Sequence, residues 1–357
     1  MWTVVHGQLS ALHSRVEWAW FALKAEVLRC AAVIDAPSST LAAVRYRLDG
    51  DALRFVCETH RELPPQPPPG RRTLVLFAHF DPQGIVDPYV AYYLKALHGL
   101  GASIVFVSGS PSLTRESVAA IHSLCAGIYT RRTLSLDFGS WHLAWCILRQ
   151  RGWSLDQFDR FVLANDSVFG PLFPIEEMWN SFHDADMYGA IENAELASHL
   201  QSFFLAWDLN SRTRPFLNDF WKGFRYIVNK YALIARYEIG LSKRARNAGL
   251  SIKPFVSAAT VKATYRRSPE HQWAGMLYSR RPINDTIYFW DGLIEHLRFP
   301  FLKTSLPRYN TPWHDSLANL PEFLEQHTSY PYGLIQSNMD RLGCGASSWV
   351  RPPAMPS

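Results

Sequence analysis

The sequence is short of charge, cysteine and long apolar runs, and each shortage excludes a class of protein. Charged residues make up 19% of the 357 residues, and the formal net charge is only +5 with the basic residues dispersed, which argues against a nucleic-acid-binding protein. No stretch approaches the roughly 20 apolar residues that a membrane-spanning helix needs. No secretory signal is visible at the N-terminus. We therefore expect a cytoplasmic protein that binds an anionic small substrate or an acidic membrane surface.

Cysteines are few and widely spaced. Their number is odd, and they form neither a C-x-x-C pair nor a zinc-finger spacing with histidine. We expect reduced and mostly buried thiols rather than disulfides or a zinc site. The five are Cys30, Cys57, Cys125, Cys146 and Cys344.

Short catalytic motifs are also missing. The chain has no G-x-x-x-x-G-K-[ST] loop, no G-x-G-x-x-G after a predicted strand, no G-x-S-x-G elbow and no H-E-x-x-H pair. These absences argue against P-loop nucleotidases, most dinucleotide dehydrogenases, serine hydrolases and zinc proteases.

The first segment that is present is amphipathic. Apolar residues recur every three or four positions from Leu9 to Ile34, which predicts one long helix that packs either on the protein's own body or on a lipid surface. An alternating pattern around Asp49-Gly50 predicts a hairpin, and five prolines then form a stiff spacer. We expect four regions: a helix-hairpin unit over 1–63, a linker over 64–72, a main domain over 73–342 and a flexible tail over 343–357.

From residue 73 onwards, predicted strands alternate with predicted helices, which is typical of an α/β fold with a mostly parallel sheet. Strands are expected over 73–78, 103–108, 127–130 and 161–164, and helices over 88–100, 113–125 and 139–151. Ligands of such sheets bind at the carboxyl ends of the strands. The polar residues expected at this edge are His79, Asp81, Ser108, Ser110 and Asp166.

Asp166 is the most informative of these residues. It follows a predicted buried strand within Asn165-Asp166-Ser167 and precedes a Gly-Pro turn. A carboxylate in this position can hold a divalent cation that bridges the two phosphates of a nucleotide sugar, and the cation offsets charge on the leaving diphosphate. The alternative is that Asp166 only caps the turn through its own backbone.

Several segments resemble, in the same order, the motifs of the rhamnan synthesis protein F family. The similarity extends over roughly residues 73–310, and D-F-G-S-W and N-D-S-V-F-G-P are its most specific strings. The segments are F-A-H-F-D-P (77–82), I-V-F-V-S (104–108), D-F-G-S-W (137–141), N-D-S-V-F-G-P (165–171), H-L-Q-S-F-F (199–204), Y-E-I-G-L-S (237–242), residues 284–290 and P-F-L-K (300–303).

The resemblance implies a GT-A-like fold, in which a nucleotide-binding sheet with flanking helices is joined to an acceptor-binding portion. It implies an inverting glycosyltransferase that moves rhamnose, or a related deoxyhexose, from dTDP-rhamnose or GDP-rhamnose to a lipid-linked glycan. Such an enzyme of rhamnan-type or O-antigen polysaccharide synthesis would work at the inner face of the cell membrane. The alternative is a non-catalytic glycan-binding or assembly component that retains the fold.

Motif order also suggests where the donor binds. Asn165-Asp166-Ser167 occupies the place of the family's D-x-D motif but keeps one carboxylate, so that Mg²⁺ or Mn²⁺ would be held by Asp166. Asp137 begins a predicted helix and either contacts the nucleotide or serves as the N-cap. For Asp81 the alternative is a structural turn with Pro82. The complete donor set is His79, Asp81, Ser108, Asp137, Asn165 and Asp166.

An inverting transfer also needs a base that takes the proton of the acceptor hydroxyl. Glu238 is the candidate, and we expect it immediately before a helix N-terminus, where the alternative role is to stabilise the helix dipole. Acceptor or diphosphate contacts are expected from His199, Gln201 and Lys303. The alternatives are a buried structural role for the first two and a solvated surface cation for Lys303.

Overall fold

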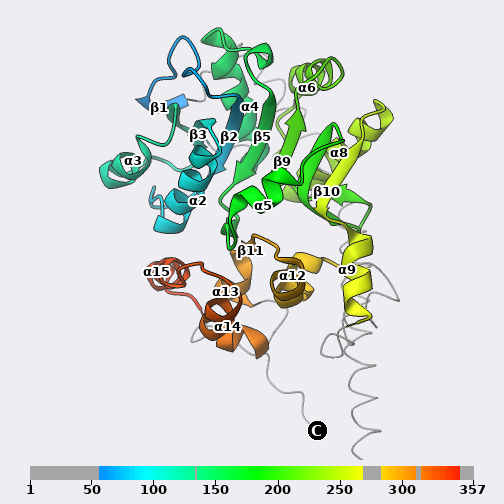
Figure 1. Cartoon of the computed structure of the whole chain (residues 1–357). Helices are drawn as coiled ribbons and strands as arrows, with labels where there is room; N and C mark the ends of the chain where they lie inside the picture. The colour runs from blue at the N-terminus through cyan, green and yellow to red at the C-terminus, as the bar shows by residue number, and fades with distance from the viewer. Residues whose placement is uncertain (1–55, 133–134, 268–282, 311–314, 346–357) are drawn as a thin grey trace, which may run out of the picture.

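The computed structural model describes residues 56–132, 135–267, 283–310 and 315–345 (Figure 1). The predicted helix between Leu9 and Ile34, the predicted hairpin at Asp49-Gly50 and most of the predicted tail lie outside the described residues.

A mostly parallel sheet forms the centre of the molecule, and it confirms the predicted α/β architecture of a sheet with flanking helices. Antiparallel pairing occurs at the edge strand β1, at β9, which is antiparallel to both of its neighbours, and at the short strand β8. The main path is, in order, β1 (Val56–Arg61), β4 (Gly127–Arg131), β3 (Ala102–Ser108), β2 (Thr73–His79), β5 (Arg160–Asn165), β9 (Phe204–Asp208), β7 (Met187–Asn193) and β10 (Ile252–Val256), and β8 (His199–Leu200) pairs with β7.

Helices cover both faces of the sheet, so the central strands are apolar on both sides. In β2, Val75 and Phe77 pack into one core, whereas Leu74 and Leu76 pack into the other. The helices and helical turns between residues 88 and 265 are α2 (Pro88–Gly99), α3 (Arg115–Ile121), α4 (Leu136–Gln150), η2 (Leu155–Gln157), α5 (Ile175–Asn180), α6 (Thr213–Lys222), α7 (Lys230–Leu233), η3 (Ile234–Ile239), α8 (Gly240–Asn247) and α9 (Ala258–Tyr265).

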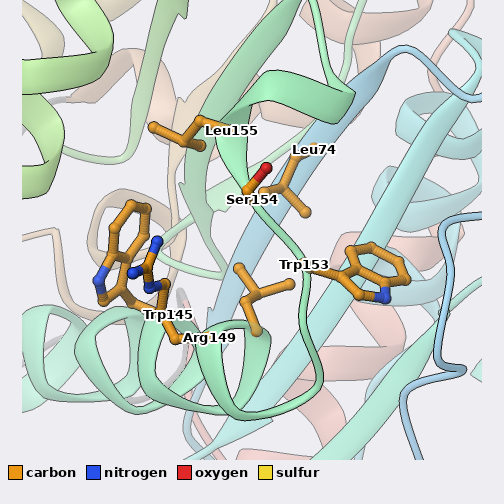
Figure 2. Close-up of a pocket in the computed structure, with 7 residues that line it drawn as sticks. Leu74, Trp145, Arg149, Trp153, Ser154 and Leu155 are labelled. Carbon is orange, nitrogen blue, oxygen red and sulfur yellow. The ribbon is translucent and has the colours of Figure 1, made fainter.

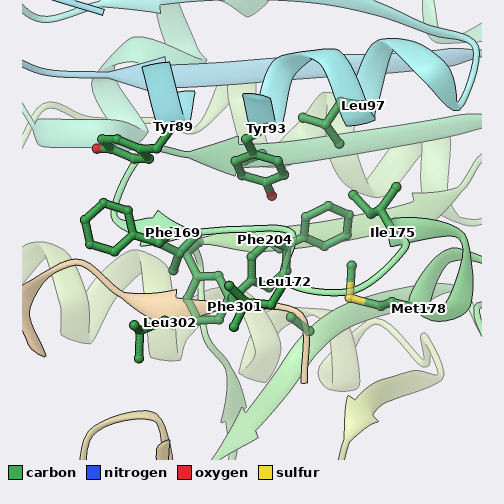
Figure 3. Close-up of a cluster of buried hydrophobic side chains, with 14 of the residues drawn as sticks. Tyr89, Tyr93, Leu97, Phe169, Leu172, Ile175, Met178, Phe204, Phe301 and Leu302 are labelled. Carbon is green, nitrogen blue, oxygen red and sulfur yellow. The ribbon is translucent and has the colours of Figure 1, made fainter. Parts of the chain in front are cut away.

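The C-terminal part is helical and is joined to the sheet by a two-stranded ribbon of β6 (Val168–Phe169) and β11 (Leu302–Lys303). Figure 3 shows the apolar contact behind this ribbon, where Tyr89 and Tyr93 of α2 lie above Phe169 and Phe301. The pairing places Lys303 opposite Val168, two residues after Asp166. The remaining elements are α11 (Asp285–Tyr288), α12 (Trp290–Leu297), α13 (Ser305–Tyr309), η5 (Asp315–Asn319), α14 (Leu320–His327) and α15 (Gly333–Leu342).

The N-terminal end of the described chain packs onto the main sheet. Residues 56–61, assigned from the sequence to the N-terminal unit, form β1 and pair with β4. Leu63 is buried, and the indole Nε1–H of Trp153 donates to the Pro64 carbonyl at 2.8 Å. The sheet therefore starts before the predicted linker.

Two smaller expectations need correction. The helix expected over 113–125 is shorter, because the side chain of Thr114 accepts a hydrogen bond from Ser117 N and caps α3, which ends at Ile121. The thiols are not mostly buried: among the described cysteines only Cys125 is buried, and Cys57 on the edge strand is exposed. Within the described residues, no helix has the length and apolar character to cross a membrane.

Candidate active site

Asp137 and Asp166 form an acidic pair at the carboxyl end of β5. Asp166 follows that strand, and Asp137 lies in the first turn of α4. The Asn165 side-chain amide links the two segments because its Nδ2 donates to Asp137 Oδ2 at 2.7 Å, while its Oδ1 accepts from the amide and hydroxyl of Ser167 at 3.1 and 2.7 Å. The Phe80 amide donates to Asp166 Oδ2 at 3.0 Å.

Burial raises the pKa of both carboxyls of the acidic pair. The pKa of Asp137 rises to about 7, first through desolvation and then through the charge of Asp166, and the charge of Glu238 contributes in the same direction. The pKa of Asp166 also rises to about 7 through desolvation, against the opposing effects of the Phe80 amide and Arg308. The Asp166 side chain keeps 16% of its surface exposed. The pair is therefore short of positive charge and accessible to a ligand.

Arg131 shapes the turn that places Asp137. Its buried guanidinium donates to the carbonyls of Arg132 and Leu136, both at 2.6 Å, and to Ser140 Oγ at 2.9 Å. These bonds hold the entry to α4, where Ser135 and Leu136 have φ values of 60° and 45°. The N-cap of α4 is Ser135, so the alternative role of Asp137 as N-cap is wrong.

Glu238 is found within a helical segment and not immediately before a helix N-terminus. It lies in the π-helical turn η3, which continues into α8 because Gly240 has helical backbone angles and nothing interrupts the chain there. Ser202 N donates to Glu238 Oε1 at 3.4 Å, and His199 Nε2 lies 3.9 Å from the same oxygen. The Glu238 side chain is 22% exposed.

Lys303 lies close enough to Asp137 and Glu238 for their charges to act on it. Its Nζ stands 4.2 Å from the centre of the Phe203 ring. Burial lowers the pKa of Lys303 to about 8, and the charges of Glu238 and Asp137 act against that shift. The ribbon of β6 and β11 therefore brings a cation from residue 303 to carboxylates that lie far away in the sequence.

His199 and Gln201 are buried beside this group. The His199 Nδ1 lies 2.7 Å from the Ala197 carbonyl oxygen. Gln201 Nε2 donates to Asn284 Oδ1 at 2.9 Å, and its Oε1 accepts from Thr286 Oγ1 at 3.3 Å. Because both ends of the Gln201 amide have protein partners, its contacts fit the structural alternative.

His79 and Ser108 lie behind the acidic pair. The His79 Nδ1 lies 2.9 Å from Ser108 Oγ, and its Nε2 lies 3.8 Å from Asp166 Oδ2. Desolvation lowers the pKa of His79 to about 4. Ser108 and Ser110 were expected at the active edge, but they are fully buried and hydrogen-bonded to each other at 2.8 Å, because they complete the hydrogen bonds of His79 and of the Asp81 amide.

Asp81 has a different environment. Its carboxylate accepts from Gln83 N and Ile85 N at 2.9 and 3.1 Å and from Arg341 at 2.7 Å. Burial acts to raise the pKa of Asp81, but these bonds prevail and lower it. Its contacts are those of the structural turn that was the alternative to donor binding.

Most of the chain matches a known protein family. Residues 104–354 match the family described as "Rhamnan synthesis protein F". The chain belongs to this family. Asp137, Asp166, Glu238 and Lys303 all lie within the matched range of the rhamnan synthesis protein F family, whereas His79 and Asp81 precede it.

Two solved structures are similar to the chain. One is the galactosyltransferase LgtC in complex with donor and acceptor sugar analogues, with 11% identity, a TM-score of 0.28, and coverage of 73% of this chain and 98% of that one. The other is the mannosyltransferase PcManGT from Pyrobaculum calidifontis in complex with GDP-Man and Mn²⁺, with 13% identity, a TM-score of 0.32, and coverage of 88% and 92%. A comparison with curated proteins finds no match.

Sequence reasoning missed two residues that contact the site, Phe80 and Tyr89. Phe80, 53% exposed, lies beside Asp166. The Tyr89 hydroxyl donates to the Asp166 carbonyl at 2.9 Å, and Arg308 donates to that hydroxyl at 3.3 Å. Phe80 lies in the F-A-H-F-D-P segment (77–82), which resembles a motif of the rhamnan synthesis protein F family, and its position after β2 was a usable signal. Nothing local in the sequence indicates the Tyr89 contact.

Two hollows elsewhere on the protein contain none of these residues. A cavity of about 10 Å³ lies between α4 and β2, lined by residues such as Leu74, Trp145 and Trp153 (Figure 2); it has room for about one water molecule. A wider surface hollow of about 700 Å³ is lined by residues of β1 and α3 with the loop before it, including His60 and Arg115.

Family membership and the α/β sheet support a glycosyltransferase of polysaccharide synthesis.

Proposed function

We propose that the protein is an inverting glycosyltransferase that moves rhamnose, or a related deoxyhexose, from a nucleoside-diphosphate donor to a lipid-linked glycan. The donor would be dTDP-rhamnose or GDP-rhamnose, and the enzyme would work at the cytoplasmic face of the cell membrane. One observation carries the proposal: Asp137 lies close enough to Asp166, Glu238 and Lys303 for electrostatic interaction with each of them, and Asp166 directly follows the carboxyl end of β5. Family membership supports the reaction class.

The acidic pair fits a divalent cation that is bound partly by these carboxylates and partly by the phosphates of the donor. Mg²⁺ is commonly bound through one or two carboxylates together with substrate phosphates rather than by a complete protein cage. Asp166 and Asp137 supply two such carboxylates with raised pKa values. Asn165 Oδ1 is already bonded to Ser167, so Asn165 acts by orienting Asp137. Mg²⁺ or Mn²⁺ bound here would offset the negative charge of the diphosphate.

Glu238 is the proposed base. It takes the proton of the acceptor hydroxyl while that oxygen forms a bond to the anomeric carbon, and the bond between that carbon and the diphosphate oxygen breaks, with inversion of configuration. The Ser202 amide donates a hydrogen bond to the Glu238 carboxylate, and His199 lies beside it. Lys303 lies close enough to Glu238 and Asp137 for electrostatic interaction with both, and its charge would stabilise the departing diphosphate.

The test measures the nucleoside diphosphate released from dTDP-rhamnose and GDP-rhamnose in the presence of a lipid-linked acceptor. We expect Glu238→Gln to lower the transfer rate by about 10²- to 10⁴-fold, and Asp166→Asn to abolish donor turnover. Glu322→Gln, at an exposed glutamate of α14, is the matched control and should retain full activity. NMR of the product should show the inverted anomer. Full activity of Glu238→Gln would remove it as the base.

A second function is favoured by the single carboxylate of Asn165-Asp166-Ser167. In this alternative the protein is a non-catalytic component that binds glycan during assembly. It predicts that no nucleotide sugar is turned over and that neither nucleoside diphosphate nor Mn²⁺ binds, while glycan does. Calorimetric titration with each compound separates the two functions.

A further inference from the structure

A patch of exposed apolar and basic side chains lies beside the candidate active site. We name it the basic rim, and define it as Arg132 and Leu136 with the exposed residues of 225–236. Three of the six large apolar side chains exposed among the described residues belong to it: Leu136 at 43%, Val228 at 58% and Tyr231 at 39%. Its exposed cations are Arg132, Arg225, Lys230 and Arg236.

The two segments of the basic rim are bonded to each other. Ser135 Oγ donates to the Ile227 carbonyl at 2.9 Å and accepts from the Ile227 amide. The Tyr237 hydroxyl accepts from Arg225 N at 2.6 Å and donates to the Arg225 carbonyl at 2.8 Å. Asn229 caps α7 by accepting from the amides of Tyr231 and Ala232. The segments that carry the exposed side chains are therefore bonded to each other.

The basic rim is unbalanced in charge and adjoins the site. Within the part of the chain that the structure describes, none of its four cations forms an ion pair; Arg236 lies against the Tyr237 ring instead. Leu136 directly precedes Asp137, and the charge of Lys230 contributes to the lowered pKa of Lys303. Unpaired cations next to exposed apolar side chains favour a partner that offers both negative charge and apolar depth.

We propose that the basic rim binds an anionic lipid surface. Val228, Tyr231 and Leu136 would enter the boundary between headgroups and acyl chains, while the long arginine and lysine side chains reach the phosphates. This inference goes beyond the proposed function, because it concerns binding that needs neither donor nor acceptor. It also differs from membrane contact through residues 9–34, because it assigns the contact to residues beside Asp137, one of which, Lys230, acts electrostatically on Lys303.

The test is flotation of the full chain with phosphatidylcholine vesicles that either contain or lack phosphatidylglycerol. We expect binding only when the anionic lipid is present, and release at high salt. Replacing Arg225 and Lys230 by Gln should weaken the partition about 30-fold, since each cation near an anionic surface contributes about 1 kcal/mol. Replacing Val228 and Tyr231 by Ser should weaken it to a similar extent. Melting curves verify that each variant is folded.

Arg115→Gln and Leu196→Ser are the matched controls, because both residues are exposed and neither belongs to the basic rim. They should bind like the unchanged protein. Equal binding to phosphatidylcholine alone would overturn the proposal, as would full binding by both double variants, which would assign membrane contact to another segment. Absence of binding to either vesicle would also overturn it. None of these outcomes depends on whether the protein transfers a sugar.

Discussion

Two groups of carboxylates lie near the carboxyl ends of the neighbouring strands β2 and β5, and they differ in their counter-charges. Asp81 and Asp87 share Arg341, which donates to them at 2.7 Å and at 2.5 to 2.8 Å. Within the described residues, Asp137 and Asp166 receive side-chain hydrogen bonds from neutral donors, the Asn165 amide and the Phe80 backbone. Accordingly, the pKa of Asp81 is lowered, whereas that of Asp137 and that of Asp166 rise to about 7.

The difference separates structural acids from acids that can bind a ligand. A buried carboxylate paired with arginine has its charge satisfied inside the protein, and its loss mainly affects folding. A pair of partly buried carboxylates without such a partner destabilises the protein when both are ionised, and groups of this kind concentrate at functional sites. The comparison therefore assigns Asp81 to the scaffold, and Asp137 and Asp166 to the chemistry.

The largest effect on stability should follow from breaking the ion pairs that Arg341 forms with Asp81 and Asp87. Arg341 is 18% exposed and its partners are 7% and 6% exposed, so Arg341→Ala leaves two buried carboxylates without their cation. We expect the free energy of unfolding to fall by about 3 kcal/mol, measured by urea denaturation. Arg298→Ala removes an ion pair with Glu177 whose members are 56% and 39% exposed and should cost at most about 1 kcal/mol. Equal losses would contradict the comparison.

The paired group also illustrates what the sequence could not reveal. The apolar runs of β2, β3 and β5 predict the strands, and the strands predict that Asp166 and Asp81 follow their carboxyl ends. The partner of Asp81 is 260 residues away on α15, and no local pattern links the two. From the sequence alone, Asp81 and Asp166 therefore looked alike, and both were assigned to the donor.

For Lys303, Glu238 and Ser108, too, the surroundings in the fold could not be predicted from the local sequence. Lys303 is brought to the site by the pairing of β11 with β6. Each of these strands has only two residues, which is too short for a sequence pattern to predict their pairing. The helix of Glu238 starts earlier than expected because the helical turn η3 precedes Gly240 without a break. Ser108 lies at the end of β3, as predicted. Its role is decided by its hydrogen bond to the buried His79, and from the sequence His79 itself was assigned to donor binding. Strand ends are predictable, whereas the hydrogen-bond partners behind them are not.

A smaller effect on stability should come from supplying a cation to Asp137 and Asp166. Nucleoside diphosphate together with Mn²⁺, at a concentration of about 100 times the dissociation constant, should stabilise the fold by about 2.7 kcal/mol, seen as a rise in melting temperature. Asp166→Asn should lose this response, because the cation loses a ligand. Asp81→Asn should keep it, although its melting temperature without ligand is lower. A response lost in both variants would place Asp81 in the donor site.

The smallest effect concerns the charge of Asp137 itself. Its pKa is about 7 in the folded protein against 3.8 in the unfolded chain, so the folded state holds the proton more tightly and its stability falls as the pH rises from about 4 to about 7. Asp137→Asn removes this penalty. Because Asp137 is only half-buried, we expect a gain of about 1 to 2 kcal/mol in the free energy of unfolding at about pH 8 and almost none at about pH 4. Asp81→Asn should have the opposite sign, since its lowered pKa stabilises the ionised protein above pH 4. Urea denaturation of the three proteins at both pH values measures the difference, and a destabilised Asp137→Asn at about pH 8 would mean that this carboxylate is already neutralised within the protein.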